Sequence, residues 1–184
     1  MLVKKLELIT DADRVLAELN SLLTTVPWPP RNQIGLKYRD NATDLWRDAE
    51  GNLYENQPHG RESHFVNWNI DQSYYVRQEI ERLENELGIK TGRIRFMRMK
   101  PKTGLTIHYD MERRYHLVLQ THPHAHFGFK NQPKEAESFD IPNVGQCYHM
   151  PKDNHWYYVD TTKMHWVYNG GDTERIHLVL CEVK

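Results

Sequence analysis

The sequence predicts a mainly β protein with flanking helices, folded as a double-stranded β-helix, the jelly-roll architecture of cupin-like proteins. Two observations lead to this fold class. Helical periodicity occurs in two segments before Gly88, and after that glycine the chain consists of short β-rich segments divided by turn residues. Strands that follow one another without intervening helices favour a closed antiparallel architecture, with the helices packed outside one sheet.

Both predicted helices carry an apolar stripe with a period of 3.6 residues. Residues 12–24 form the first helix, which follows a plausible N-terminal cap around Asp11. The second helix starts at Asp71 or Ser73 and ends at Gly88, a residue suited to the left-handed conformation that often terminates helices. Between the two helices, residues 31–70 lack periodicity and are expected to form an irregular, lid-like segment with short strands.

Eight strands are predicted between Gly88 and the C-terminus, on the basis of alternating or β-rich composition and of turn residues between some of them. The predicted strands are residues 93–100, 105–109, 113–121, 125–129, 145–150, 155–160, 164–169 and 174–183. Turn residues lie at 101–104, 131–133 and 169–172.

Length and composition restrict the domain organisation and the class of partner. With 184 residues and a mass of 22.0 kDa, the chain is expected to form one domain. Residues 1–90 would be its helical and irregular part, and residues 91–184 would be the jelly-roll core. The net charge of −1 gives no electrostatic reason to expect a nucleic acid or an anionic membrane as a partner.

The cysteine content and the N-terminus indicate a cytoplasmic protein. Cys147 and Cys181 are too few for a disulfide framework, and the N-terminal residues contain no long apolar run typical of a signal peptide or membrane span. Both thiols are expected to be reduced, and each is interpreted as a small core residue.

Three residues suggest a metal site. His108 and Asp110 are two positions apart on an extended segment, so their side chains are expected to point to the same face. An isolated pair of this kind is weak evidence, but His165 on a later strand offers a third ligand. Two imidazoles and one carboxylate hold Fe(II) on one face and leave three coordination sites open. We therefore predict that these residues bind Fe(II) in a non-haem oxygenase.

Arg175 lies ten residues beyond His165 and is a candidate to bind the distal end of a dicarboxylate. If residues 169–171 form a three-residue loop of a β-hairpin, His165 lies opposite Arg175 and both side chains face the same side. The alternative is that Arg175 is an exposed strand residue or pairs with Glu174 or Glu182.

Arg114 and His116 form a second same-face pair on the strand after the HxD motif. Together with His108 and Asp110 they give four inward polar side chains, which suits a hydrated reaction pocket better than an apolar core. The alternative for either residue is a solvated edge position. His177 shares the face of Arg175 and could also line the cavity.

A rival metal site is conceivable at His122, His124 and His126, which would share one strand face. Pro123 weakens a central strand there, and three imidazoles without a carboxylate suit zinc or nickel better than iron. An edge strand is the simpler interpretation. The five tryptophans and ten tyrosines are interpreted as core and lid residues rather than as a stacking surface.

Two segments, MKPKTGLTIHYDMERRYHLVLQT and HWVYNGGDTERIHLVL, resemble the 2-oxoglutarate-dependent Fe(II) oxygenases of the aspartyl/asparaginyl β-hydroxylase group, which includes free-proline hydroxylases. The shared pattern is a proline-threonine lead-in, a metal histidine, an Arg-x-His strand, a distal histidine followed by an asparagine, and an arginine ten residues further on. The resemblance covers roughly residues 93–183. Some aspartyl β-hydroxylases have a glycine at the position of Asp110, so this chain carries the fuller triad and is similar to the free amino acid hydroxylases in that respect.

The resemblance implies a role for each matching residue. His108, Asp110 and His165 would bind iron, Arg175 would bind the distal carboxylate of 2-oxoglutarate, His116 would lie near its metal-proximal carboxylate, and Arg114 would face the prime substrate. The implied cofactors are Fe(II), 2-oxoglutarate as cosubstrate and O2. The implied reaction couples the oxidative decarboxylation of 2-oxoglutarate to hydroxylation of an amino acid or peptide side chain.

Two other functions remain open from the sequence alone. The first is a jelly-roll module that binds a carboxylated ligand without redox chemistry, and the intact triad disfavours it. The second is a cupin-like metalloenzyme that does not use 2-oxoglutarate, and the position of Arg175 disfavours it.

Overall fold

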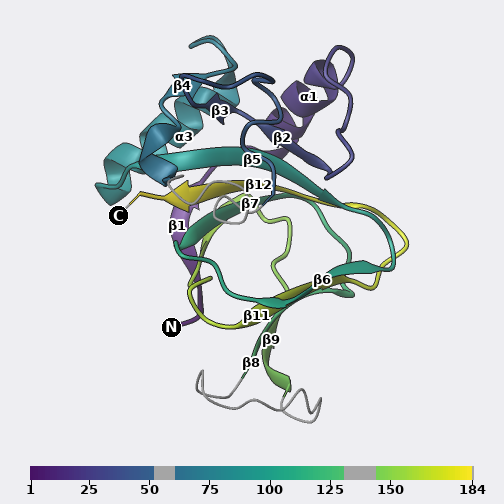
Figure 1. Cartoon of the computed structure of the whole chain (residues 1–184). Coiled ribbons are helices and arrows are strands. Elements are labelled where there is room, and N and C mark those ends of the chain that lie inside the picture. Colours follow the sequence, from purple (N-terminus) through teal and green to yellow (C-terminus); the bar gives the residue numbers. More distant parts are fainter. Residues whose placement is uncertain (52–60, 131–143, 184) are drawn as a thin grey trace.

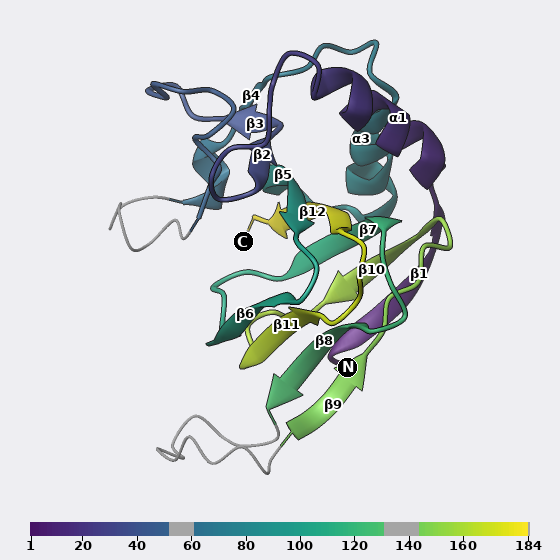
Figure 2. The same cartoon turned by 90° about the vertical axis from the view of Figure 1, so that its right-hand side faces the viewer.

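The computed structural model describes residues 1–51, 61–130 and 144–183, which form two antiparallel sheets that face each other with two helices on the outside (Figures 1 and 2). The larger sheet has six strands in the order β1 (Val3–Ile9), β10 (His155–Val159), β7 (Arg114–Gln120), β12 (Arg175–Glu182), β5 (Thr91–Met99) and β2 (Gln33–Gly35). The smaller sheet has four strands in the order β6 (Thr103–His108), β11 (His165–Asn169), β8 (Ala125–Lys130) and β9 (Val144–Tyr148). This arrangement is the predicted jelly-roll.

All eight strands predicted after Gly88 are present, and each boundary agrees with the prediction to within two residues. One further strand, β1, was not predicted, whereas three others are short strands of the kind expected within residues 31–70. Of these, β3 (Lys37–Tyr38) and β4 (Asn67–Trp68) form a separate short ribbon, and a 3-10 turn, η1 (Glu62–His64), lies just before β4. The turn predicted at residues 131–133 and part of the lid predicted at residues 31–70, namely 52–60, lie outside the described residues.

The N-terminal strand β1 extends the six-stranded sheet by pairing with β10. Leu6 and Leu8 are buried whereas Lys5 and Glu7 are exposed, an alternation with a period of two that the sequence analysis overlooked. Since β2 pairs with β5 in the same sheet, residues 1–90 are not only helical and irregular. They supply both edges of the larger sheet.

The first helix, α1 (Ala12–Leu22), begins where the sequence predicts and ends two residues earlier. The Asp11 carboxylate accepts hydrogen bonds from the backbone amides of Asp13 and Arg14 and so caps the helix. The exposed fractions of Val15 and Leu19 are both 0%. The predicted apolar stripe therefore packs against the sheet.

The second helix, α3 (Tyr75–Leu87), starts later than predicted because its N-terminus is capped from another element. The Glu18 carboxylate of α1 accepts hydrogen bonds from the amides of Tyr75 and Val76, at 2.7 and 2.9 Å. Asp71 instead accepts from the amide of Ser73 and stabilises the preceding turn. Gly88 ends the helix in the left-handed conformation, with φ 64°, as predicted.

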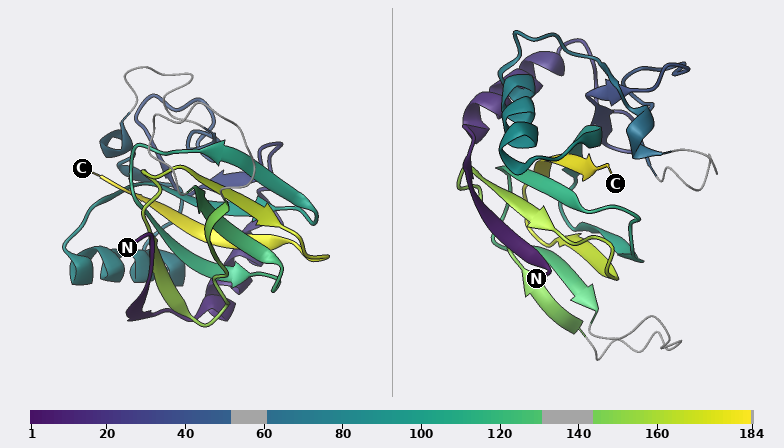
Figure 3. Two further views of the ribbon diagram at one scale, coloured as in Figure 1. Left: turned by 90° about the horizontal axis from the view of Figure 1, so that it is seen from below. Right: turned by 90° about the vertical axis from the view of Figure 1, so that its left-hand side faces the viewer.

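The main apolar core lies between the two helices and the outer face of the six-stranded sheet. Figure 3 shows both helices outside this sheet. Trp156 is fully buried there, and its indole nitrogen donates to the hydroxyl of Thr10 at 2.9 Å.

The prediction that both cysteines are core residues is half correct, because Cys181 is buried but Cys147 is exposed. No helix in the described residues is both long and apolar enough to cross a lipid bilayer.

The six-stranded sheet presents charged and polar side chains on the face that looks toward the smaller sheet. On β5, Ile94 and Phe96 belong to the outer core, whereas Arg93 and Arg95 alternate with them and are also buried. Arg93 forms an ion pair with Glu62 at 2.6 Å, which satisfies both charges inside the protein. Part of the space between the two sheets is therefore polar, and this part contains the residues singled out from the sequence. A second apolar cluster, formed by strands of both sheets, also lies between them.

Candidate metal centre

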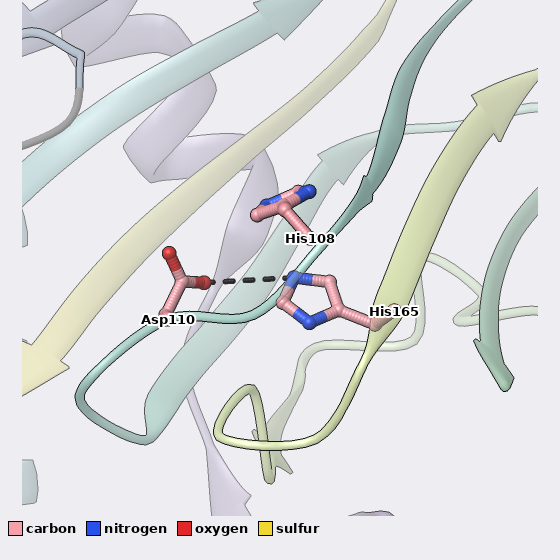
Figure 4. Close-up of side chains that lie close together, drawn as sticks. All are labelled: His108, Asp110 and His165. Atoms are coloured by element: carbon pink, nitrogen blue, oxygen red, sulfur yellow. Dashed lines mark ion pairs between the residues drawn. The ribbon is translucent and has the colours of Figure 1, made fainter. Parts of the chain in front are cut away.

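The two candidate histidine ligands lie directly opposite each other on neighbouring strands of the smaller sheet. His108 at the end of β6 pairs with His165 at the start of β11, and the centroids of their rings are 4.3 Å apart. Asp110 follows two residues after His108, and its amide donates to the carbonyl of Thr161 at 2.8 Å. One ligand atom from each of the three side chains lies within 4.8 Å of the others (Figure 4).

Backbone carbonyls fix the tautomer of both histidines. Nδ1 of His108 lies 2.7 Å from the carbonyl oxygen of Thr106, and Nδ1 of His165 lies 2.8 Å from that of Lys163. Because a carbonyl can only accept a hydrogen bond, Nδ1 carries the proton in each ring and Nε2 retains a free lone pair. This is the arrangement that metal-binding histidines use.

Burial is the main reason why the pKa of His165 is lowered to about 4. The side chain is 1% exposed and stacks on Phe127, with ring centroids 4.9 Å apart. Its imidazole is therefore neutral at physiological pH, which is the protonation state that can bind a metal.

The carboxylate of Asp110 uses one oxygen within the protein and leaves the other free. Oδ1 accepts a hydrogen bond from Nη2 of Arg114 at 2.5 Å. Oδ2 is buried without a hydrogen-bond partner among the described residues, 3.5 Å from Nε2 of His165 (Figure 4). Since a neutral His165 has a lone pair on Nε2, two acceptors face each other there, and a bound cation would remove their repulsion. The residues present therefore fit a divalent metal, and this donor set is typical of non-haem Fe(II).

The predicted hairpin between His165 and Arg175 is wrong. Strands β11 and β12 belong to different sheets, and β12 pairs with β5 and β7 instead. His165 and Arg175 nevertheless face the same space, because the two sheets oppose each other across it. Both side chains line one inner cavity of about 70 Å³, which is room for several water molecules or a small ligand.

The inner cavity has a strongly cationic polar lining. Among its described lining residues there are four arginines, three histidines and one glutamine, and no acidic side chain. These residues are Arg31, Arg98, Arg114, Arg175, His108, His116, His165 and Gln33. Such a lining fits an anionic ligand.

Of the four arginines that line the inner cavity, Arg175 alone is buried without an acidic partner in the described part of the chain. It is 8% exposed, and its recorded hydrogen bond is from Nη2 to Nδ1 of His177, at 3.3 Å. Desolvation lowers the pKa of Arg175 to about 10. The alternative pairing with Glu174 does not occur, because that carboxylate pairs with Arg98 at 3.3 Å. A buried guanidinium without a counterion favours an anion at this position.

His116 and His177 lie next to Arg175 inside the molecule. Their Nδ1 atoms are 3.4 Å apart, and both Nε2 atoms are buried without a partner among the described residues. Burial holds the pKa of each imidazole well below 6.5, so both are neutral. The alternative of a solvated edge position is wrong for His116, which is 4% exposed.

Acid is expected to destabilise the metal-free protein through these two histidines. The folded state keeps His116 and His177 neutral, whereas the unfolded chain takes up protons below about pH 6.5. The stability that they contribute is therefore fully present above that pH and falls with decreasing pH, by about 1.4 kcal/mol per pH unit for each histidine. Urea unfolding with a chelator present, between about pH 7.5 and 5.5, measures this loss.

Substituting one of the buried histidines provides the control for this experiment. The variant His177→Gln should take up about one proton fewer on unfolding and show a shallower pH dependence, whereas His124→Gln, at an exposed position, should behave like the unmodified protein. A stability that does not change over this pH range would contradict the assignment.

A second cavity of about 410 Å³, called the outer cavity below, borders the triad. His108, Asp110 and Arg114 line it together with Arg93 and Glu112. Its apolar lining consists of Ile107, Tyr109, Met111 and Met164. His108 and Arg114 border both cavities, so the two cavities adjoin at the candidate metal centre.

The rival cluster does not assemble into a metal site in the described structure. His122 and His124 precede β8, so they do not share a strand face with His126, and the His126 ring lies 6.2 Å from that of His149. Within the described residues, His108, Asp110 and His165 are the one group of three that meets the distance criterion for a metal site.

Some lining residues were not identified from the sequence. Arg31 and Gln33 border the inner cavity, but they belong to a segment without periodicity, so no local pattern points to them. Phe127 could have been found, because it shares a strand face with Phe129 and both are buried.

Comparison with known proteins agrees with this fold. A family model described as aspartyl/asparaginyl beta-hydroxylase matches residues 10–183. No curated protein sequence matches significantly. This family model extends well beyond the segments that carry the motifs, into the N-terminal part that had no recognisable resemblance.

Three solved structures show the same fold at low sequence identity. HygX from Streptomyces hygroscopicus, with nickel and 2-oxoglutarate bound, has a TM-score of 0.60 at 9% identity, over 98% of this chain and 82% of its own. AviO1 from Streptomyces viridochromogenes has a TM-score of 0.60 at 12% identity, over 100% and 90%. A Pseudomonas putida prolyl-4-hydroxylase has a TM-score of 0.52 at 13% identity, over 99% and 92%.

Proposed function

Because this chain belongs to the aspartyl/asparaginyl β-hydroxylase family, we propose that it is a 2-oxoglutarate-dependent Fe(II) dioxygenase that hydroxylates an amino acid or a peptide side chain. The observation that best supports this proposal is the buried Arg175, which has no acidic partner among the described residues and shares a cavity with His108 and His165. A cavity that brings two of the candidate metal ligands together with an unpaired cation suits an oxoacid that binds the metal at one end and the cation at the other.

The triad and the inner cavity define the proposed roles. His108, Asp110 and His165 hold Fe(II) through two Nε2 atoms and Oδ2. Arg175 binds the distal carboxylate of 2-oxoglutarate, and His116 lies beside the metal-proximal end. When bound, Fe(II) supplies the activation of O2 that is coupled to decarboxylation of the oxoacid. The protein's own contribution is to orient the oxoacid and to exclude water, for which Phe127 and Val167 supply apolar walls.

The prime substrate is assigned to the outer cavity, which lies against His108 and Asp110 but does not reach Arg175. Arg114 borders this cavity and is the side chain best suited to contact an anionic group of the substrate. A location in the cytoplasm, expected from the sequence, is part of the same proposal.

Turnover in the presence of Fe(II) and O2 tests the proposal. Succinate release from 2-oxoglutarate should depend on added Fe(II) and increase when the correct amino acid or peptide is supplied from a screen. Incorporation of oxygen from ¹⁸O2 into the product would identify the reaction as a hydroxylation. Turnover of a substrate without 2-oxoglutarate would favour a cupin-like metalloenzyme instead, and binding of 2-oxoglutarate without any turnover across the screen would favour a binding module.

A further inference from the structure

Arg114 connects the two sheets at the candidate metal centre. It is the first residue of β7 in the larger sheet, whereas Asp110 follows β6 of the smaller one. Its Nη2 atom donates to Oδ1 of Asp110 at 2.5 Å, and the side chains of Arg114 and Asp110 are 12% and 16% exposed. This ion pair is therefore largely shielded from water, where it is stronger than at the surface.

The backbone on both sides of this ion pair is held in place. Arg114 pairs with Val159 of β10 on one side and with Cys181 of β12 on the other. Asp110 is tied through its amide to the carbonyl of Thr161. Since both main chains are fixed, rotation of the Asp110 side chain is the remaining freedom, and it decides which carboxylate oxygen faces the histidines.

Arg114 restricts that rotation. With Oδ1 hydrogen-bonded to the guanidinium, Oδ2 is the oxygen that faces Nε2 of His165 and has no partner. A carboxylate held in this way offers the metal one oxygen rather than two. Single-oxygen binding leaves three coordination sites open, whereas chelation by both oxygens would occupy one of them.

We infer that Arg114 is a positioning residue of the metal centre, which holds Asp110 so that Oδ2 alone binds the metal. The inference rests on the proposed function, because it requires that the triad binds a metal. This positioning role differs from the substrate contact proposed above for Arg114. It predicts that Arg114 affects metal binding even when neither substrate nor 2-oxoglutarate is present.

The test is a titration of the metal-free protein with Co²⁺ alone, followed by absorption spectroscopy of the bound ion. Arg114→Leu should raise the dissociation constant for Co²⁺ by about 10- to 100-fold, the usual effect of removing a partner of a metal ligand. It should also change the Co²⁺ spectrum, because the carboxylate is free to rotate. Arg114→Lys retains a donor and should recover part of the affinity. The matched control is Arg113→Leu, an exposed neighbour, which should bind Co²⁺ like the unmodified protein.

A double-mutant cycle separates positioning from a general effect on the fold. In the Asp110→Ala background the ligand oxygen is already lost, so adding Arg114→Leu should weaken Co²⁺ binding no further. Equal weakening in both backgrounds would overturn the inference, as would an unchanged affinity and spectrum in Arg114→Leu. If Arg114→Leu does not fold, Arg114→Lys and Arg114→Gln are judged by the same criteria. Absence of Co²⁺ binding by the unmodified protein would refute the proposed metal site itself.

Discussion

Replacing His165 with alanine is expected to abolish metal binding and, with it, all turnover. His165 is one of the three proposed ligands, and within the described residues His108, Asp110 and His165 are the one group of three suited to hold a metal. In the unmodified protein, Fe(II) uptake followed by 2-oxoglutarate without oxygen should produce a metal-to-ligand absorption band near the visible region. The variant should show neither the uptake nor the band.

The control for this experiment is His124→Ala, which removes an exposed histidine from the rival cluster. This variant should bind Fe(II) and form the absorption band like the unmodified protein. If His165→Ala retained the band, His165 could not be a ligand, and loss of the band in His124→Ala would move the metal site to the rival cluster. Circular dichroism of both variants shows whether the fold is intact.

Replacing Arg175 with leucine is expected to weaken 2-oxoglutarate binding strongly and metal binding little. The guanidinium is buried, and a carboxylate that enters the cavity without it would be desolvated and unpaired. Loss of one partner of a buried ion pair costs about 3–5 kcal/mol, which corresponds to a rise of about 100-fold or more in the dissociation constant. Titration of the metal-loaded protein with 2-oxoglutarate, without oxygen, measures this change.

Arg98→Leu serves as the matched control, because Arg98 also lines the inner cavity but is already paired with Glu174. Its effect on 2-oxoglutarate binding should be much smaller. Arg175→Lys should be intermediate, because lysine retains the charge but loses the two-pronged geometry of the guanidinium. An unchanged affinity for 2-oxoglutarate in Arg175→Leu would contradict the assignment of Arg175.

Much of the fold could be predicted because its elements carry local patterns. The alternation along the eight strands after Gly88 and the apolar stripes of α1 and α3 are local properties, and each element formed where its pattern indicates. The start of α3 could not be predicted in this way. Its cap is the carboxylate of Glu18, 57 residues away from Tyr75 in the chain.

The candidate residues could be chosen from the sequence, but the contacts between distant elements could not. The same-face placement of His108 and Asp110 was predicted from the two-residue period of an extended segment. Residue type and spacing singled out His165, His116 and Arg175, and the family resemblance gave each of them a role. The hydrogen bond from Arg114 to Asp110 links residues that are only four apart, yet Arg114 begins β7 of the larger sheet and Asp110 lies just beyond the end of β6 of the smaller one. No local rule indicates such a contact.

By itself, the sequence determined the jelly-roll class, the eight C-terminal strands and the identity of the chemical groups in the site, because side-chain periodicity and residue type are local properties. Only the tertiary structure decided that β11 and β12 lie in different sheets, that β1 and β2 complete the larger sheet, and that Arg175 faces the triad across a cavity. The physical reason is that strand pairing is chosen by the burial of whole sheet faces and by long-range hydrogen bonds, which involve residues far apart in the chain.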